Sequence, residues 1–181
     1  MTPEPKKLNS PTKRNLPSEN NQSGEGQNRP RPLDSNDFSQ KSEDIVTTIV
    51  KRINSFNTGL KEYQIRDLVN ETEKLGKKLF DKKLKTAQIR KFLDAINQLN
   101  AQLKREKDFE KIKPGIELLR PQLAYAEGRQ QSLKEEQQNV KYLRSVMEAA
   151  IKKIEDSEDF TRLVQLIESI IAYHKAAGGK E

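Results

Sequence analysis

The sequence predicts an all-α fold: a compact helical bundle of about five to six helices behind a disordered N-terminal extension. Three observations support this prediction. Apolar residues recur every three or four positions between Ile45 and Ile171. No stretch shows the alternation of apolar and polar residues that marks a half-buried strand. Six of the eight prolines fall within the first 41 residues, outside the periodic part of the chain.

Residues 1–41 form the predicted extension, and residues 42–181 form the predicted bundle domain. The extension contains only five apolar residues, so it cannot bury enough surface to offset the entropy lost on ordering. Its seven basic and five acidic residues give a charge of +2, which leaves +5 of the total +7 for the bundle. A plain polar extension and a basic tail that contacts nucleic acid are both compatible with this composition.

The first three helices follow from apolar spacing and from residues that begin or end a helix. Ser42 is the expected N-cap of the first, Asn57-Thr58-Gly59 ends it, and its apolar face holds Ile45, Val46, Ile49, Val50 and Ile53. The second carries Tyr63, Leu68, Leu75 and Leu79. The third begins at Thr86, with a core side of Ile89, Phe92, Leu93, Ile96, Leu99 and Leu103. Arg90, Lys91 and Gln98 point away from that stripe, toward solvent or a partner.

The second half of the chain predicts three more helices. The fourth apolar segment holds Phe109, Ile112, Ile116, Leu119 and Leu123. Pro114 interrupts it and can begin a fresh helix, Pro121 is expected to kink that helix, and Gly128 is expected to end or bend it. A long helix follows, with Leu133, Val140, Leu143, Met147, Ala150 and Ile154 at heptad-like spacing. Asp156 or Ser157 caps the last helix, whose apolar face holds Phe160, Leu163, Val164, Ile167, Ile170 and Ile171.

The most basic stretch runs from Lys74 to Phe92 and contains eight basic residues and one acidic residue, Asp81. Lys82, Lys83 and Lys85 lie just before the helix that begins at Thr86, where the helix dipole repels cations. Positive charge at a position where it lowers local stability suggests an anionic partner, and helix N-termini bind phosphate. A solvated, Lys-rich loop explains the same residues, and this stretch alone does not separate the two interpretations.

Composition and motifs argue against enzymatic chemistry. The absence of Cys excludes disulfides and thiolate metal sites, and a single His provides no zinc or di-metal ligand set. His174 is expected to be a packing or surface residue, and neither glycine-containing basic segment has the spacing of a phosphate loop. We therefore expect no catalysis, no cofactor and no metal. No segment resembles a secretory signal or a membrane span, so a soluble cytoplasmic protein without a membrane partner is expected.

Three segments together resemble a known family. They are 86–92 (TAQIRKF), 118–129 (LLRPQLAYAEGR) and 171–180 (IAYHKAAGGK). In this order, on an all-helical chain, they are similar to the small helical subunit of the type III-A CRISPR effector, the Csm complex. The resemblance covers about residues 45–181 and is most specific in the second and third segments, whereas residues 1–41 have no counterpart in the family pattern.

The resemblance implies a non-catalytic, RNA-binding scaffold in antiviral defence. Such subunits stack in several copies beside the guide-binding backbone subunits, and the backbone and large subunits carry the nuclease and cyclic oligoadenylate activities. The implied partners are guide RNA, single-stranded target RNA, the other Csm subunits and further copies of the chain. Because any target sequence must be accepted, cations on phosphates are expected instead of donors aimed at base edges.

The candidate RNA-binding residues come mainly from the three resembling segments. They are Gln88, Arg90 and Lys91, then Arg120, Tyr125 and Arg129, then Lys175 and Lys180; Lys85 is added from the basic stretch. Arg90 is also explained by a surface ion pair, and Tyr125 fits a core position better than a stacking platform. Pro121 leaves the direction of Arg120 open.

Two other classes of function fit a basic helical bundle. One is a protein–protein adaptor whose charged faces bind partners and not RNA. The other is a helix-turn-helix DNA-binding protein that uses the helix beginning at Thr86. That motif requires a short helix before the turn, and residues 84–86 give little turn signal.

Overall fold

Six α-helices and one short 3-10 helix make up the regular structure of residues 43–129 and 134–179, which this computed structural model describes, with the backbone alone for 134–138. The helices are α1 (Ile45–Ser55), α2 (Ile65–Asp81), α3 (Thr86–Glu106), α4 (Lys113–Gly128), α5 (Lys134–Ile151) and α6 (Ser157–Ala176); η1 covers Leu60–Glu62. No strand occurs within these residues. The predicted all-α bundle is confirmed. The extension predicted for residues 1–41 lies outside the described residues.

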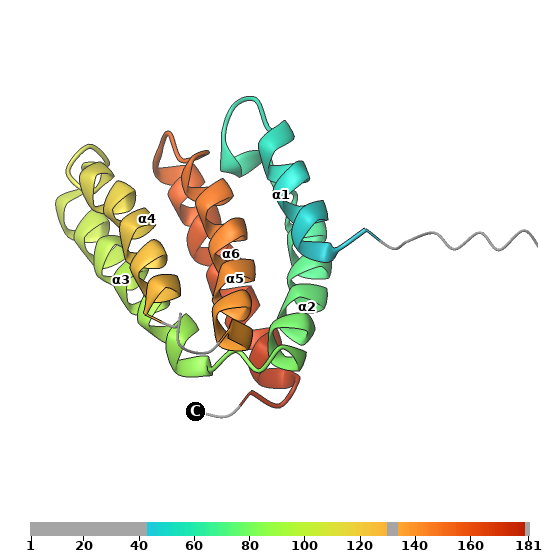
Figure 1. Cartoon of the computed structure of the whole chain (residues 1–181). Helices are drawn as coiled ribbons and strands as arrows, with labels where there is room; N and C mark the ends of the chain where they lie inside the picture. The colour runs from blue at the N-terminus through green and yellow to red at the C-terminus, as the bar shows by residue number, and fades with distance from the viewer. Residues whose placement is uncertain (1–42, 130–133, 180–181) are drawn as a thin grey trace, which may run out of the picture. The chain divides into compact units, whose positions relative to one another are not determined.

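The helices α5 and α6 lie between two flanking pairs, α1 with α2 and α3 with α4 (Figure 1). Helix α6 packs against α2 and α3, and α5 packs against α1 and α4. The short connection between α3 and α4 makes them neighbours that run in opposite directions. One side of this α3–α4 pair packs on the central helices, so its other side is left at the surface.

Apolar side chains from all six helices form one core, and the predicted apolar faces supply it. Phe160, Leu163 and Ile167 of α6 are fully buried, as expected for a central helix. In α3 three residues of the predicted apolar stripe are only half-buried: Leu93, Leu99 and Leu103. This difference follows from the peripheral position of α3, which has neighbours on one side only.

Acidic side chains fix the starts of α1 and α6. The predicted N-cap of α1, Ser42, lies outside the described residues, and Asp44 caps this helix by accepting from the Val46 amide at 3.0 Å. In α6 the choice left open by the sequence falls on Asp156, whose carboxylate accepts from the amides of Glu158 and Asp159. Both carboxylates satisfy amides that have no partner inside their helices.

The end of α2 is a Schellman motif with an unusual residue in it. Lys83 adopts a left-handed conformation (φ 59°), and its amide donates to the carbonyl of Phe80 at 2.7 Å. The next amide, from Leu84, donates to the carbonyl of Leu79 at 2.9 Å. Glycine is preferred at the left-handed position of this motif because it lacks the Cβ that makes the conformation costly. The motif turns Leu84 into the core and leaves Lys83 exposed.

Close packing between α2 and α6 brings the chain's C-terminal part to this turn. A Cβ atom at Gly76 would lie 2.7 Å from the backbone nitrogen of His174, so only glycine permits this approach of the two helices. His174 is 1% exposed, and its Nε2 lies 2.9 Å from the carbonyl oxygen of Leu84. Beyond α6, the Gly179 amide donates to the carbonyl of His174 at 3.1 Å. Residues 82–85, which connect α2 to α3, and residues 178–179 are therefore neighbours.

Candidate nucleic-acid interface

A groove of about 370 Å³ opens between the first turns of α3 and the last turns of α4. Its floor is apolar and consists of Leu84, Phe92, Leu123, Val140 and Leu143. Its rim consists of Gln88, Lys91, Gln122, Tyr125, Ala126 and Arg129. We call it the α3–α4 groove. None of these lining residues is acidic, so the charge of the rim is positive.

The rim residues of α4 lie on one side of that helix because of their spacing. Gln122, Tyr125 and Arg129 are three and four residues apart, which places them along a single face. The buried residues Ile116 and Leu119, together with Leu123 from the groove floor, mark the core-facing side, which is centred about 120° around the helix from the rim. A helix packed on one side only therefore presents the whole rim outward.

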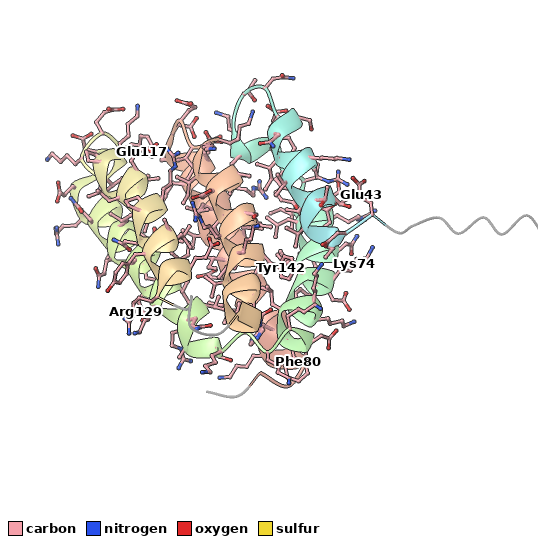
Figure 2. The ribbon with its side chains drawn as sticks, in the orientation of Figure 1. Glu43, Lys74, Phe80, Glu117, Arg129 and Tyr142 are labelled. Atoms are coloured by element: carbon pink, nitrogen blue, oxygen red, sulfur yellow. The ribbon has the colours of Figure 1, made fainter. Side chains whose placement is uncertain are left out.

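Tyr125 is the most exposed large apolar side chain among the described residues, at 69%. This position differs from the core position that the sequence favours for it. The guanidinium carbon of Arg129 lies 5.9 Å from the centroid of the Tyr125 ring, within reach of a cation–π interaction. Figure 2 shows Arg129 at the end of α4, on the outer side of the α3–α4 pair. Both Arg129 and Tyr125 are thus available to a ligand.

On α3, Gln88 and Lys91 are three residues apart and share the side that faces the groove. Arg90 is exposed, as expected, but does not line the groove. One residue corresponds to about 100° around a helix, so Arg90 lies on a different side of α3 from Lys91. The residues of segment 86–92 therefore point in two directions: Gln88 and Lys91 face the groove, and Arg90 faces away from it.

A second, shallower groove of about 770 Å³ adjoins the first, because Leu84 lines both. Its other lining residues are Phe80, Asp81, Lys83, Lys85, Ala87, Gly178 and Gly179. We call it the C-terminal groove. Phe80 and Arg129 lie at the same end of the helices (Figure 2). Three lysines lie just before α3, and two of them, Lys83 and Lys85, thus line a surface that continues from the α3–α4 groove.

Arg120 lies elsewhere. Nine residues separate it from Arg129, or about two and a half helical turns, which places the two side chains on opposite sides of α4. Its guanidinium pairs with Glu117 at 3.1 Å, and its Nε is buried without a hydrogen-bond partner. Exposed pairs of this kind contribute little to stability.

The structure therefore brings together four of the nine predicted site residues: Gln88, Lys91, Tyr125 and Arg129. Lys85 lines the adjoining groove. Arg90, Arg120 and Lys175 line neither groove, although Lys175 is exposed in the last turn of α6, and Lys180 lies outside the described residues. Gln122 and Lys83 were not among the predicted residues. Gln122 could have been found from its spacing of three residues before Tyr125.

The described residues hold no group of three or more His, Asp or Glu side chains that could bind a metal ion. Among them, no helix has the length and apolar character of a membrane span. His174 is held in the core: its Nε2 bonds to the Leu84 carbonyl, and its Nδ1 lies 3.4 Å from the Thr86 hydroxyl. Burial lowers the pKa of His174.

Comparison with known proteins places the chain in a family. A model of the family described as Csm2 Type III-A matches residues 62–180, a range that contains both grooves. This chain belongs to the type III-A Csm2 family. The "CRISPR system Cms protein Csm2" of Streptococcus thermophilus is 33% identical over 98 residues, which cover 54% of this chain and 76% of that protein. No solved structure matches the chain.

Membership of the Csm2 family confirms the resemblance inferred from the three sequence segments. The chain is accordingly a small structural subunit of the type III-A CRISPR complex, in which it joins other Csm subunits. The matched range begins in η1 and therefore leaves out α1.

Proposed function

We propose that this Csm2-family subunit binds single-stranded target RNA and the backbone of the guide–target duplex without sequence selection. The observation that carries this proposal is the α3–α4 groove, which Lys91 lines from α3 and Arg129 lines from the end of α4, beside Tyr125. Two cations on a rim whose described residues include no carboxylate favour a polyanion. Cations on phosphates also supply affinity that does not depend on base sequence, which suits a subunit that must accept any target.

The C-terminal groove extends the proposed contact surface. Lys83 and Lys85 line it, and its shared residue Leu84 connects it to the α3–α4 groove. A strand that crosses both grooves would meet cations from α4, α3 and the turn before α3. Lys175 and Lys180 would add charge where the chain leaves α6, and Arg90 would contribute on the neighbouring side of α3.

The proposed role is non-catalytic. It consists of scaffolding the complex in the cytoplasm, in antiviral defence, beside the backbone and large subunits and further copies of this chain. Exposed apolar residues away from the grooves are suited to contacts between subunits: Leu118 is 59% exposed and Ile65 is 47% exposed. A pure protein–protein adaptor would use these residues and leave the groove cations without an anionic partner.

RNA affinity measured at several salt concentrations tests the proposal. Each phosphate neutralised on a single strand contributes about −0.7 to the slope of log affinity against log salt. Roughly three to five contacts predict a slope of about −2 to −3.5. The isolated chain should bind weakly and gain affinity when copies align in the complex. Affinity that is independent of salt, or stronger binding to duplex DNA than to single-stranded RNA, would overturn the proposal.

A further inference from the structure

The α3–α4 groove has a feature that backbone binding does not use, namely an apolar interior beside an exposed aromatic ring. Phe92 and Leu123 contribute to its floor, and the ring of Tyr125 is 69% exposed at its edge. Phosphates gain nothing from apolar surface. A ligand that fills the groove therefore needs a flat or apolar part as well as a negative charge.

The rim supplies the complementary polar groups. Arg129 lies against the Tyr125 ring, so it can interact with a stacked ligand or with a phosphate attached to that ligand. The Gln88 side chain, opposite on α3, accepts from the Lys85 backbone amide through Oε1 at 3.3 Å, and its amide nitrogen can donate a hydrogen bond to a base edge. An aromatic ring, an amide and two cations around an apolar floor match the parts of one nucleotide: its base, its base edge and its flanking phosphates.

We propose that the α3–α4 groove holds one unpaired RNA base, stacked on Tyr125, with its flanking phosphates at Lys91 and Arg129. This inference rests on the proposed function and narrows it to a subsite for single-stranded nucleotides. The volume of about 370 Å³ lies within the roughly 300–1,000 Å³ of small-ligand pockets. Because every base has a π-face, such a site binds bases without reading sequence. A base paired in a duplex cannot enter it.

An apolar side chain of a neighbouring protein fits the groove less well. It would cover the floor, but it would leave Lys91 and Arg129 without a negative partner at the rim. An exposed apolar residue of α4 outside the groove is better suited to a protein contact: Leu118 lies seven residues, about two turns, before Tyr125 on the same side of the helix. It provides a matched control.

The test compares the full-length wild type with Tyr125→Ala, Tyr125→Phe and Leu118→Ala. The probes are oligouridine, an abasic ribose-phosphate oligomer of the same length, and an RNA duplex. Stacking on an aromatic side chain contributes about 5- to 150-fold per base. Tyr125→Ala should weaken oligouridine binding by a factor in that range, and Tyr125→Phe and Leu118→Ala should stay within about twofold of the wild type. Helix content, followed by circular dichroism, should be equal in all variants.

The abasic and duplex probes separate this inference from the proposed function. Wild type should prefer oligouridine to the abasic oligomer, and Tyr125→Ala should abolish that preference without changing the salt slope. Salt-dependent RNA binding that is unaffected by Tyr125→Ala, or equally weakened for the abasic oligomer, overturns base stacking and leaves backbone binding intact. Absence of salt-dependent RNA binding overturns both. If Tyr125→Ala no longer associates with other Csm subunits but keeps its RNA affinity, the groove belongs to a protein partner, and this result also overturns the inference.

Discussion

His174 of α6 donates a hydrogen bond from Nε2 to the carbonyl oxygen of Leu84, 2.9 Å away and 90 residues earlier in the chain. A carbonyl can only accept, so Nε2 carries a proton, and in the neutral imidazole Nδ1 accepts from the Thr86 hydroxyl. The two contacts attach the end of α6 to the residue that lines both grooves and to the first residue of α3. Burial of the ring lowers its pKa and so favours the neutral imidazole in this arrangement.

The first prediction is a loss of stability on acidification. Burial lowers the pKa of His174 below its ordinary value of about 6.5, and the hydrogen bond to Leu84 only partly opposes this effect. The unfolded chain therefore binds a proton at higher pH than the folded chain. The contribution of His174 to the free energy of unfolding is present above about pH 6.5 and is lost as the pH falls through the lowered folded pKa.

Urea unfolding between pH 7.5 and pH 5 measures this effect in the wild type and in His174→Gln. The variant should be less stable at neutral pH because it loses a buried hydrogen bond, but its stability should fall less between pH 6.5 and pH 5. Only the difference in pH dependence tests the prediction. Parallel curves for the two proteins would contradict the prediction, because they would show that the pKa of His174 is the same in the folded and the unfolded chain.

The fold was largely predictable because its signals are local. Apolar spacing identified every helix, Thr86 was predicted as the first residue of α3, and Pro114 lies in the first turn of α4. The N-cap of α1 was predicted wrongly: Ser42 was expected, with Asp44 in the first turn, whereas Asp44 caps the helix. What places the cap at Asp44 is the burial of Val46 and its neighbours against the core, a tertiary effect.

The candidate site was only partly predictable. The outward position of Tyr125 could have been derived from the apolar residues of α4, because Leu123 lies about 200° from it around the helix. A general preference of aromatic residues for the core outweighed that signal. The meeting of α3 with α4 across a groove could not be derived, because it depends on long-range packing. The same holds for the attachment of residues 178–179 to the turn after α2.

A second prediction concerns two helical glycines with opposite surroundings. Gly76→Ala should destabilise the protein by about 1–3 kcal/mol, since its Cβ would lie 2.7 Å from the backbone of α6. Gly128→Ala, at the end of α4, should stabilise it by about 0.4–1 kcal/mol, because no described atom lies within 4 Å of its Cβ. Urea unfolding measures both. A stabilising Gly76→Ala would mean that α2 and α6 are not packed this closely.

A third prediction concerns Lys83, a non-glycine residue whose backbone adopts the left-handed conformation. Lys83→Gly should raise the free energy of unfolding by about 0.5–1 kcal/mol, because glycine adopts φ 59° without the cost of a Cβ. Lys82→Gly is the control: Lys82 has φ −83°, so glycine there should stabilise nothing. If Lys83 contacts RNA in the C-terminal groove, the Lys83→Gly variant should be more stable than the wild type but should bind RNA more weakly. Equal effects of the two substitutions on stability would contradict the conformational explanation.

The last prediction separates the α3–α4 groove from the rest of the basic surface. Lys91→Ala and Arg129→Ala should each weaken binding for all RNA sequences alike, because each removes a cation from the groove rim. Each loss of a phosphate contact should make the salt slope shallower by about 0.7 or less. The measurement is RNA affinity at several salt concentrations, with circular dichroism to confirm equal helix content.

Arg120→Ala provides the contrast, because Arg120 lies on the opposite side of α4 and pairs with Glu117. Each of Lys91→Ala, Arg120→Ala and Arg129→Ala removes one positive charge. An effect of net charge alone would therefore change RNA binding equally in all three variants. If the groove is the contact surface, Arg120→Ala should leave the salt slope within about 0.2 of the wild type, well below the 0.7 expected for one contact. Arg90→Ala, on the other flank of α3, should fall between these limits if the strand extends beyond the groove. A salt slope that responds to Arg120 as strongly as to Arg129 would place RNA on the side of α4 that carries Arg120, away from the groove rim.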